Sequence, residues 1–157
     1  MSIVNASFRN ATGINRFMKE KRKMPSFVKI KDTKSVRGYG AFAQMDIPKL
    51  ARLGVYDGKV YLPQMSPTND YLFSVHVDTS PYHFLVDGED MRYANWTRFV
   101  NHGMTERERN TAFQQDGNKI VLYSTKHISK GDEIIASYGT KEWEDKLRAK
   151  QQMVKRK

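Results

Sequence analysis

The sequence of 157 residues contains no cysteine. This absence excludes disulfide bonds and zinc sites built from cysteine. No apolar run approaches the length that crosses a bilayer, and no secretory signal pattern opens the chain. We therefore expect a soluble intracellular protein without membrane contact, and its length suits one domain with one core.

Several signatures of common enzyme classes are also missing. The four histidines (His76, His83, His102 and His127) lack the spacing of metal ligands. No glycine-rich phosphate loop ends in Lys-Ser or Lys-Thr, and no serine-nucleophile motif is present. The sequence thus predicts no metal site and points away from phosphate-loop enzymes and serine hydrolases.

Positive charge is concentrated at the two ends of the chain, which has a net charge of +10. Residues 1–37 carry ten Lys/Arg and two Asp/Glu, and residues 141–157 carry seven and three. Residues 38–140 carry ten and twelve, a net charge of −2. The basic flanks have two interpretations, solubility or contact with nucleic acid or nucleosomes. The mildly acidic body favours a basic peptide as substrate.

Short apolar runs between glycine and proline turns predict a mostly β fold with a few short helices, knotted or sandwich-like. The strongest hairpin signal lies within residues 111–124, where Asp116-Gly117 separates two strand-like runs. Residues 71–75 and 82–86 are further predicted strands. A short amphipathic helix is predicted around residues 8–18, and a second helix from Thr140 onward.

Four motifs carry the chemistry. The most specific are Arg98-Phe99-Val100-Asn101-His102-Gly103 and Glu133-Ile134-Ile135-Ala136-Ser137-Tyr138-Gly139. With Arg37–Ala43 and Asp70–Ser74 before them, they stand in the order found in SET-domain protein lysine methyltransferases, which this chain resembles over residues 27–147. The style is closest to minimal viral SET proteins and to the PR branch of that family, as Asn95-Trp96 before the third motif also indicates.

The resemblance implies the SET-domain β-fold, with short curled sheets, a pseudo-knot and a C-terminal helix. It divides the chain into a basic N-terminal extension (1–25), a SET catalytic core (26–140), and a C-terminal helix with a basic tail (141–157). Asn110, which follows the third motif, is expected to order its loop as a structural residue.

The resemblance also implies S-adenosyl-L-methionine as cofactor, S-adenosyl-L-homocysteine as product, and no metal. Glycine at two alternate positions would let the backbone approach the cofactor, because neither has a β-carbon. The residues expected to bind the cofactor are Arg37, Gly38, Tyr39, Gly40, Arg98, Asn101 and His102.

Methyl transfer from a sulfonium to an amine is an in-line displacement that needs aligned reactants, a neutral amine and exclusion of water. By resemblance, Tyr138 is the catalytic tyrosine that orients the amine, and Tyr71 lines the channel through which the substrate lysine enters. Trp143 is expected to line the same channel. The expected substrate is a histone tail or another basic peptide, which would place the protein in the nucleus of the cell or host cell.

Two departures from the family pattern keep alternatives open. Gly103 stands where the family usually has Ser or Cys, and Glu142 stands where Phe or Tyr is common before Trp143. The first alternative is a non-catalytic SET-like module that binds nucleosomes or nucleic acid through its basic flanks. The second is a methyltransferase of a non-histone protein. A homodimer, as in minimal viral members, is a further expectation that no sequence pattern specifies.

Overall fold

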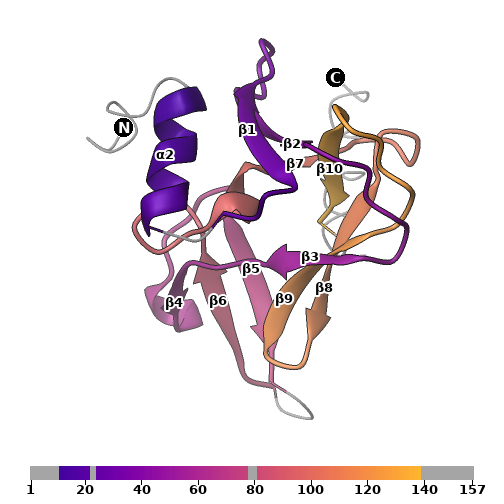
Figure 1. The fold of residues 1–157 in the computed structure, drawn as a ribbon. Helices are drawn as coiled ribbons and strands as arrows, with labels where there is room; N and C mark the ends of the chain where they lie inside the picture. The colour runs from indigo at the N-terminus through magenta and orange to yellow at the C-terminus, as the bar shows by residue number, and fades with distance from the viewer. Residues whose placement is uncertain (1–10, 22–23, 78–80, 139–157) are drawn as a thin grey trace, which may run out of the picture.

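Short antiparallel strands dominate the computed structural model, which describes residues 11–21, 24–77 and 81–138 (Figure 1). The elements are α2 (Ala11–Lys21), β1 (Val28–Asp32), β2 (Tyr39–Ala43), β3 (Arg52–Val55), β4 (Lys59–Tyr61), the 3₁₀ turn η1 (Pro63–Met65), β5 (Leu72–His76), β6 (His83–Asp87), the 3₁₀ turn η2 (Trp96–Phe99), β7 (Asn101–His102), β8 (Thr111–Asp116), β9 (Lys119–Ser124) and β10 (Glu133–Ser137).

The larger sheet has seven strands in the order β1-β2-β10-β8-β9-β3, and β7 pairs with β10 beside this path. Strand β10 lies in the middle of this sheet and pairs with three other strands. Its first half pairs antiparallel with β2, and its second half pairs in parallel with β7 and with β8. A strand from the end of the described chain is thereby inserted between strands from its beginning and its middle.

The smaller sheet has three antiparallel strands in the order β4-β6-β5. Its β5–β6 hairpin lies beside the β8–β9 hairpin of the larger sheet (Figure 1). The side-chain amide of Gln115 in β8 joins the two, because it donates to the His76 carbonyl at 2.6 Å and accepts from the His76 N–H at 3.0 Å. This contact satisfies the outer edge of β5 at its C-terminal end.

One hydrophobic core holds the two sheets and the helix together. Ile14 and Met18 of α2 are buried four residues apart, so one face of the helix packs on the sheet. Asn15 fastens the helix to the outer strand, since its amide donates to the Ile30 carbonyl and accepts from the Ile30 N–H. Helix α2 of the N-terminal extension therefore contributes Ile14 and Met18 to the packed core.

The predicted elements agree with the structure where it describes them. The β8–β9 hairpin turns at Gly117, whose φ is +62°, and Asp116 pairs with Lys119. The helix predicted around residues 8–18 is α2, and the predicted mostly β fold is confirmed. The predicted C-terminal helix and Trp143 lie outside the described residues. Among the helices that are described, none is long and apolar enough to span a bilayer.

Candidate functional site

Strand β10 brings three of the four sequence motifs to one place. Its residues Glu133 and Ile134 pair with Phe42 and Ala41 of the first motif, and Ile135 and Ala136 pair with Asn101 and His102 of the third. The strand ends at Ser137, directly before Tyr138. The sheet register therefore pairs residues that are far apart in the sequence, such as Ala41 with Ile134.

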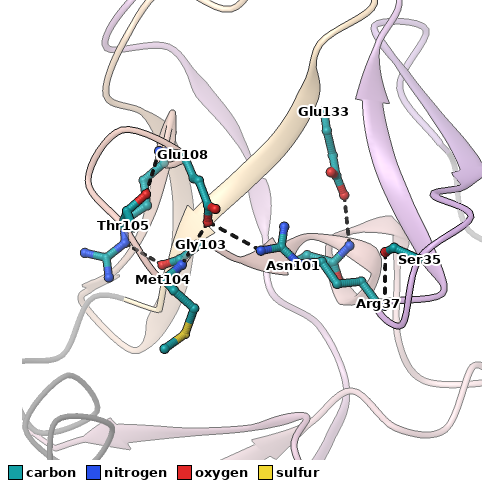
Figure 2. Close-up of polar contacts among 9 residues, drawn as sticks. Ser35, Arg37, Asn101, Gly103, Met104, Thr105, Glu108 and Glu133 are labelled. Carbon is teal, nitrogen blue, oxygen red and sulfur yellow. Dashed lines mark hydrogen bonds and ion pairs between the residues drawn. The ribbon is translucent and has the colours of Figure 1, made fainter. Parts of the chain in front are cut away.

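Asn101 lies at the meeting point of the first and third motifs. Its side-chain Nδ2 donates to Oε1 of Glu133 at 2.9 Å (Figure 2). The same nitrogen donates to the Tyr39 carbonyl at 3.2 Å. Gly40 lies directly beneath the Glu133 carboxylate, so that a β-carbon at this position would clash with Oε1. The glycine that the sequence assigned to cofactor approach therefore also makes room for a carboxylate.

Arg37 occupies the turn between β1 and β2. Gly38 next to it has φ +73° and no atom within 4 Å of where a β-carbon would lie, so this turn borders open space. The guanidinium of Arg37 pairs with Glu108 at 3.4 Å across the site, and both side chains are partly exposed (Figure 2).

The loop of residues 103–109 carries Glu108 to this position. Glu108 also accepts from the Met104 N–H at 3.1 Å, and Arg109 donates to the Gly103 carbonyl at 2.7 Å. A β-carbon at Gly103 would lie 2.8 Å from Ile135 and 3.0 Å from Arg109. Glycine at this departure from the family pattern thus permits the loop to fold back tightly.

Tyr138 stands in an aromatic pocket. Its hydroxyl donates to the Val100 carbonyl at 3.0 Å, and its backbone N–H donates to Nδ1 of His102 at 3.2 Å. Its ring centroid lies 5.5 Å from that of Phe73 and 5.8 Å from that of Phe113. Burial, more than the neighbouring tyrosine and aspartate of the second motif, raises the pKa of Tyr138 to about 12, against a smaller lowering by Arg37.

Tyr71 enters the site from the smaller sheet. The guanidinium of Arg98 lies 4.6 Å from the centroid of the Tyr71 ring, an arrangement typical of a cation–π contact. Arg98 is buried and donates to the carbonyls of Gly88 and Glu89 at 2.7 and 3.0 Å. In the structure Arg98 therefore supports Tyr71 and the turn after β6, and its predicted contact with the cofactor stays a prediction.

Asn110 has the structural role expected from the sequence. Its amide donates to the Glu133 carbonyl and accepts from the Ile135 N–H, each at 2.9 Å. These bonds tie the end of the 103–109 loop to β10. Among the described residues, no group of three or more His, Cys, Asp or Glu side chains could hold a metal ion.

Sequence reasoning did not single out four side chains that shape the site: Tyr56, Glu108, Phe113 and Glu133. Tyr56 donates its hydroxyl to the Tyr71 carbonyl at 2.6 Å, and its ring packs on Phe73 and Phe113. Glu133 belonged to the last motif but had no assigned role. Glu108 lies 71 residues from its partner, so no local pattern could have indicated the pair.

Comparison with known proteins supports the family. Residues 28–150 match the model of the PR domain of PR domain zinc finger protein 2. The chain is 26% identical over 118 residues to histone-lysine N-methyltransferase set-17 of Caenorhabditis elegans, and 27% identical over 94 residues to histone-lysine N-methyltransferase PRDM7 of Homo sapiens. These matches cover 74% and 60% of this chain but only 42% and 19% of the two relatives, so the chain spans less than half of their length.

Solved structures show the same fold. The methyltransferase domain of human PR domain-containing protein 2 is similar with a TM-score of 0.65 and 22% identity, covering 78% of this chain and 83% of that one. The SET domain of the RIZ1 tumor suppressor (PRDM2) is similar with a TM-score of 0.69 and 19% identity, covering 91% of each chain.

Proposed function

The chain belongs to the PR-domain branch of the SET-domain family, and on that premise we propose that it methylates lysine side chains of a protein with S-adenosylmethionine as donor. The observation that carries the proposal is the convergence on β10 of strand β2 of the first motif, the Asn101-His102 pair and Tyr138. These are the groups that a cofactor cradle and a methyl-transfer channel require, and they meet at one side of the larger sheet.

The residues on the cofactor side fit the charges of S-adenosylmethionine. The cofactor has a carboxylate and an ammonium on its amino-acid part, and when bound it supplies an electrophilic methyl group. Arg37 offers a cation for the carboxylate. Asn101 offers its side-chain oxygen for the ammonium, since its Nδ2 is already bonded within the protein. The open space beside Gly38 lets the backbone approach the ligand.

The residues on the lysine side favour a neutral amine. Lysine ordinarily has a pKa near ~10.4, and an apolar channel lowers it by penalising the charged form. Phe73 and Phe113 supply apolar walls next to Tyr138. The Tyr138 hydroxyl stays protonated at neutral pH and donates to the Val100 carbonyl at 3.0 Å. A phenol that donates one hydrogen bond can also accept through its oxygen, and we propose that this oxygen accepts from the incoming amine. Tyr138 thereby orients the nucleophile without taking its proton.

Strand β5 supports a peptide as substrate. It is an edge strand of the smaller sheet. The backbone N–H and carbonyl groups of successive residues point alternately toward β6 and away from it. Because the N–H and carbonyl of His76 both bond Gln115, the backbone groups of Ser74 and Leu72 face outward too. A substrate strand could add there, beside Tyr71. We propose a histone tail as that peptide, hence nuclear action, with the basic flanks contacting nucleosomal DNA.

The test is methyl transfer from labelled S-adenosylmethionine to core histones and nucleosomes, comparing the wild type with Tyr138→Phe. We expect labelled histone with the wild type and a loss of about 100-fold with Tyr138→Phe, the size typical of a misplaced reactant. Tyr123→Phe is the matched control, since that exposed hydroxyl donates to Asp116 of the neighbouring strand and has no other hydrogen-bond partner among residues 11–21, 24–77 and 81–138. The control should leave the rate unchanged.

Other results would change the assignment. If Tyr138→Phe transfers as much label as the wild type, the proposed activity stands and the catalytic role of Tyr138 is rejected. An absence of label together with retained cofactor binding would point to a non-histone substrate. An absence of both would favour the non-catalytic module that acts through the basic flanks.

A further inference from the structure

The side-chain amide of Asn101 has only one chemically acceptable orientation. The two groups that it faces on one side are the Glu133 carboxylate and the Tyr39 carbonyl, and both are acceptors. An amide oxygen placed there would face two other oxygens, so the nitrogen must lie on that side. Both N–H bonds of Asn101 are thus used within the protein.

The oxygen of the same amide consequently faces the other way. Within the described part of the chain no group donates a hydrogen bond to Oδ1 of Asn101. Asn101 is half-buried, and its strand β7 is only two residues long. An acceptor that is fixed by bonds on its nitrogen side and half-removed from water is suited to a cationic donor of a ligand.

The Glu133 carboxylate occupies the space that a side chain at position 40 would fill. A β-carbon built on Gly40 would collide with its Oε1, next to the residues through which β2 and β10 pair. With glycine at position 40, the carboxylate lies in this space while its Oε1 accepts from Asn101. The Glu133 carboxylate thus lies beside Gly40 and accepts a hydrogen bond from Asn101, so residues of three separate motif segments lie together.

We propose that Glu133 is a positioning residue of the cofactor site, which orients the Asn101 amide so that its oxygen accepts from the ammonium group of the cofactor's amino-acid part. This inference rests on the proposed function. Glu133 acts through Asn101 and does not itself contact the cofactor. The role differs from a purely structural one because it concerns a single chemical group of the ligand.

A double-mutant cycle measured by calorimetric binding of S-adenosylhomocysteine tests the proposal. The set is the wild type, Asn101→Ala, Glu133→Leu and the double variant. A hydrogen bond to a charged group typically contributes enough for about tenfold or more in affinity. We expect each single variant to lose about tenfold and the double variant to lose no more than Asn101→Ala alone, because Glu133 acts only through Asn101.

A second ligand separates positioning from general damage. 5′-Methylthioadenosine lacks the amino-acid part, so Glu133→Leu should leave its affinity within about twofold of the wild type. Glu133→Gln is the conservative variant, since its amide oxygen can still accept from Asn101, and it should restore most of the affinity for S-adenosylhomocysteine. Thermal unfolding of each variant without ligand reports its folding separately.

Several outcomes would overturn the inference. Losses that add in the double variant, or an equal loss for both ligands, would show that Glu133 does not act through Asn101. Should Glu133→Leu fail to fold, the exchange Asn101→Asp with Glu133→Gln replaces it. That exchange reverses donor and acceptor, and it should bind better than Asn101→Asp alone; no gain would reject the coupling. A wild type that binds 5′-methylthioadenosine and S-adenosylhomocysteine equally would reject this inference alone, whereas one that binds neither would reject the proposed function as well.

Discussion

At the scale of single residues, the environment of Tyr138 determines its protonation. Burial is the main cause that raises its pKa from 10 to about 12, so the folded protein retains the phenol proton where the unfolded chain has lost it. The stability that the neutral phenol contributes is fully present below pH 10. It is lost as the pH rises from 10 through about 12.

This shift predicts how the effect of Tyr138→Phe depends on pH. The difference in the free energy of unfolding between wild type and variant should be constant from pH 7 to 9. Above pH 10 it should move in favour of the variant by up to roughly 1.4 kcal/mol per pH unit. Urea denaturation at a series of pH values measures it. A difference that stays constant to pH 11.5 would contradict the buried, neutral phenol.

At the scale of elements, the 103–109 loop depends on a glycine where the family usually has Ser or Cys. Gly103→Ser would place a β-carbon against Ile135 and Arg109, and we expect it to cost about 1–3 kcal/mol of stability through overpacking. It should also move Glu108 away from Arg37. The free energy of unfolding from urea titration measures the first effect.

A substitution at a second glycine shows whether the cost at Gly103 comes from crowding by the new side chain or from replacing any glycine. Gly117 is at the tip of the β8–β9 hairpin, where no atom lies within 4 Å of an added β-carbon and φ is +62°. Asn accepts such a backbone conformation, so Gly117→Asn should change the stability by less than about 0.5 kcal/mol. An equal cost at both positions would mean that packing at Gly103 is not the cause.

The elements also show what a sequence can reveal. The β8–β9 hairpin was predictable because Asp116-Gly117 encodes its turn locally. Tyr138 and Asn101 could be predicted as site residues because each lies in a contiguous motif that resembles one of the family. The pairs Arg37–Glu108 and Asn101–Glu133 could not, since 71 and 32 residues separate the partners and only the pairing of β10 brings them together. Asn15 was missed for the same reason: its partner is the backbone of Ile30, which has no sequence signal.

At the scale of the whole molecule, the two sheets divide the proposed reaction between them. The residues assigned to the amino-acid part of the cofactor belong to the larger sheet, at the β1–β2 turn and at β7. The open edge of β5 belongs to the smaller sheet, and Tyr71 directly precedes that strand. The hydroxyl of Tyr56, which follows β3, crosses this boundary to the Tyr71 carbonyl at 2.6 Å. The relative position of the two sheets should therefore affect the substrate lysine more than the cofactor.

Tyr56→Phe tests that division. It removes the hydroxyl and retains the ring that packs on Phe73 and Phe113. The Tyr71 carbonyl still accepts from the Gly88 N–H, so the expected loss is one hydrogen bond, about 0.5–1.5 kcal/mol. If all of it appears in the transition state, methyl transfer falls about 2-fold to 10-fold while S-adenosylhomocysteine affinity stays unchanged. The measurements are the rate of transfer to histone peptides and calorimetric affinity. Equal losses in transfer rate and in S-adenosylhomocysteine affinity would mean that the Tyr56 hydrogen bond supports the cofactor side and the lysine side alike. The proposed division between the two sheets would then be wrong.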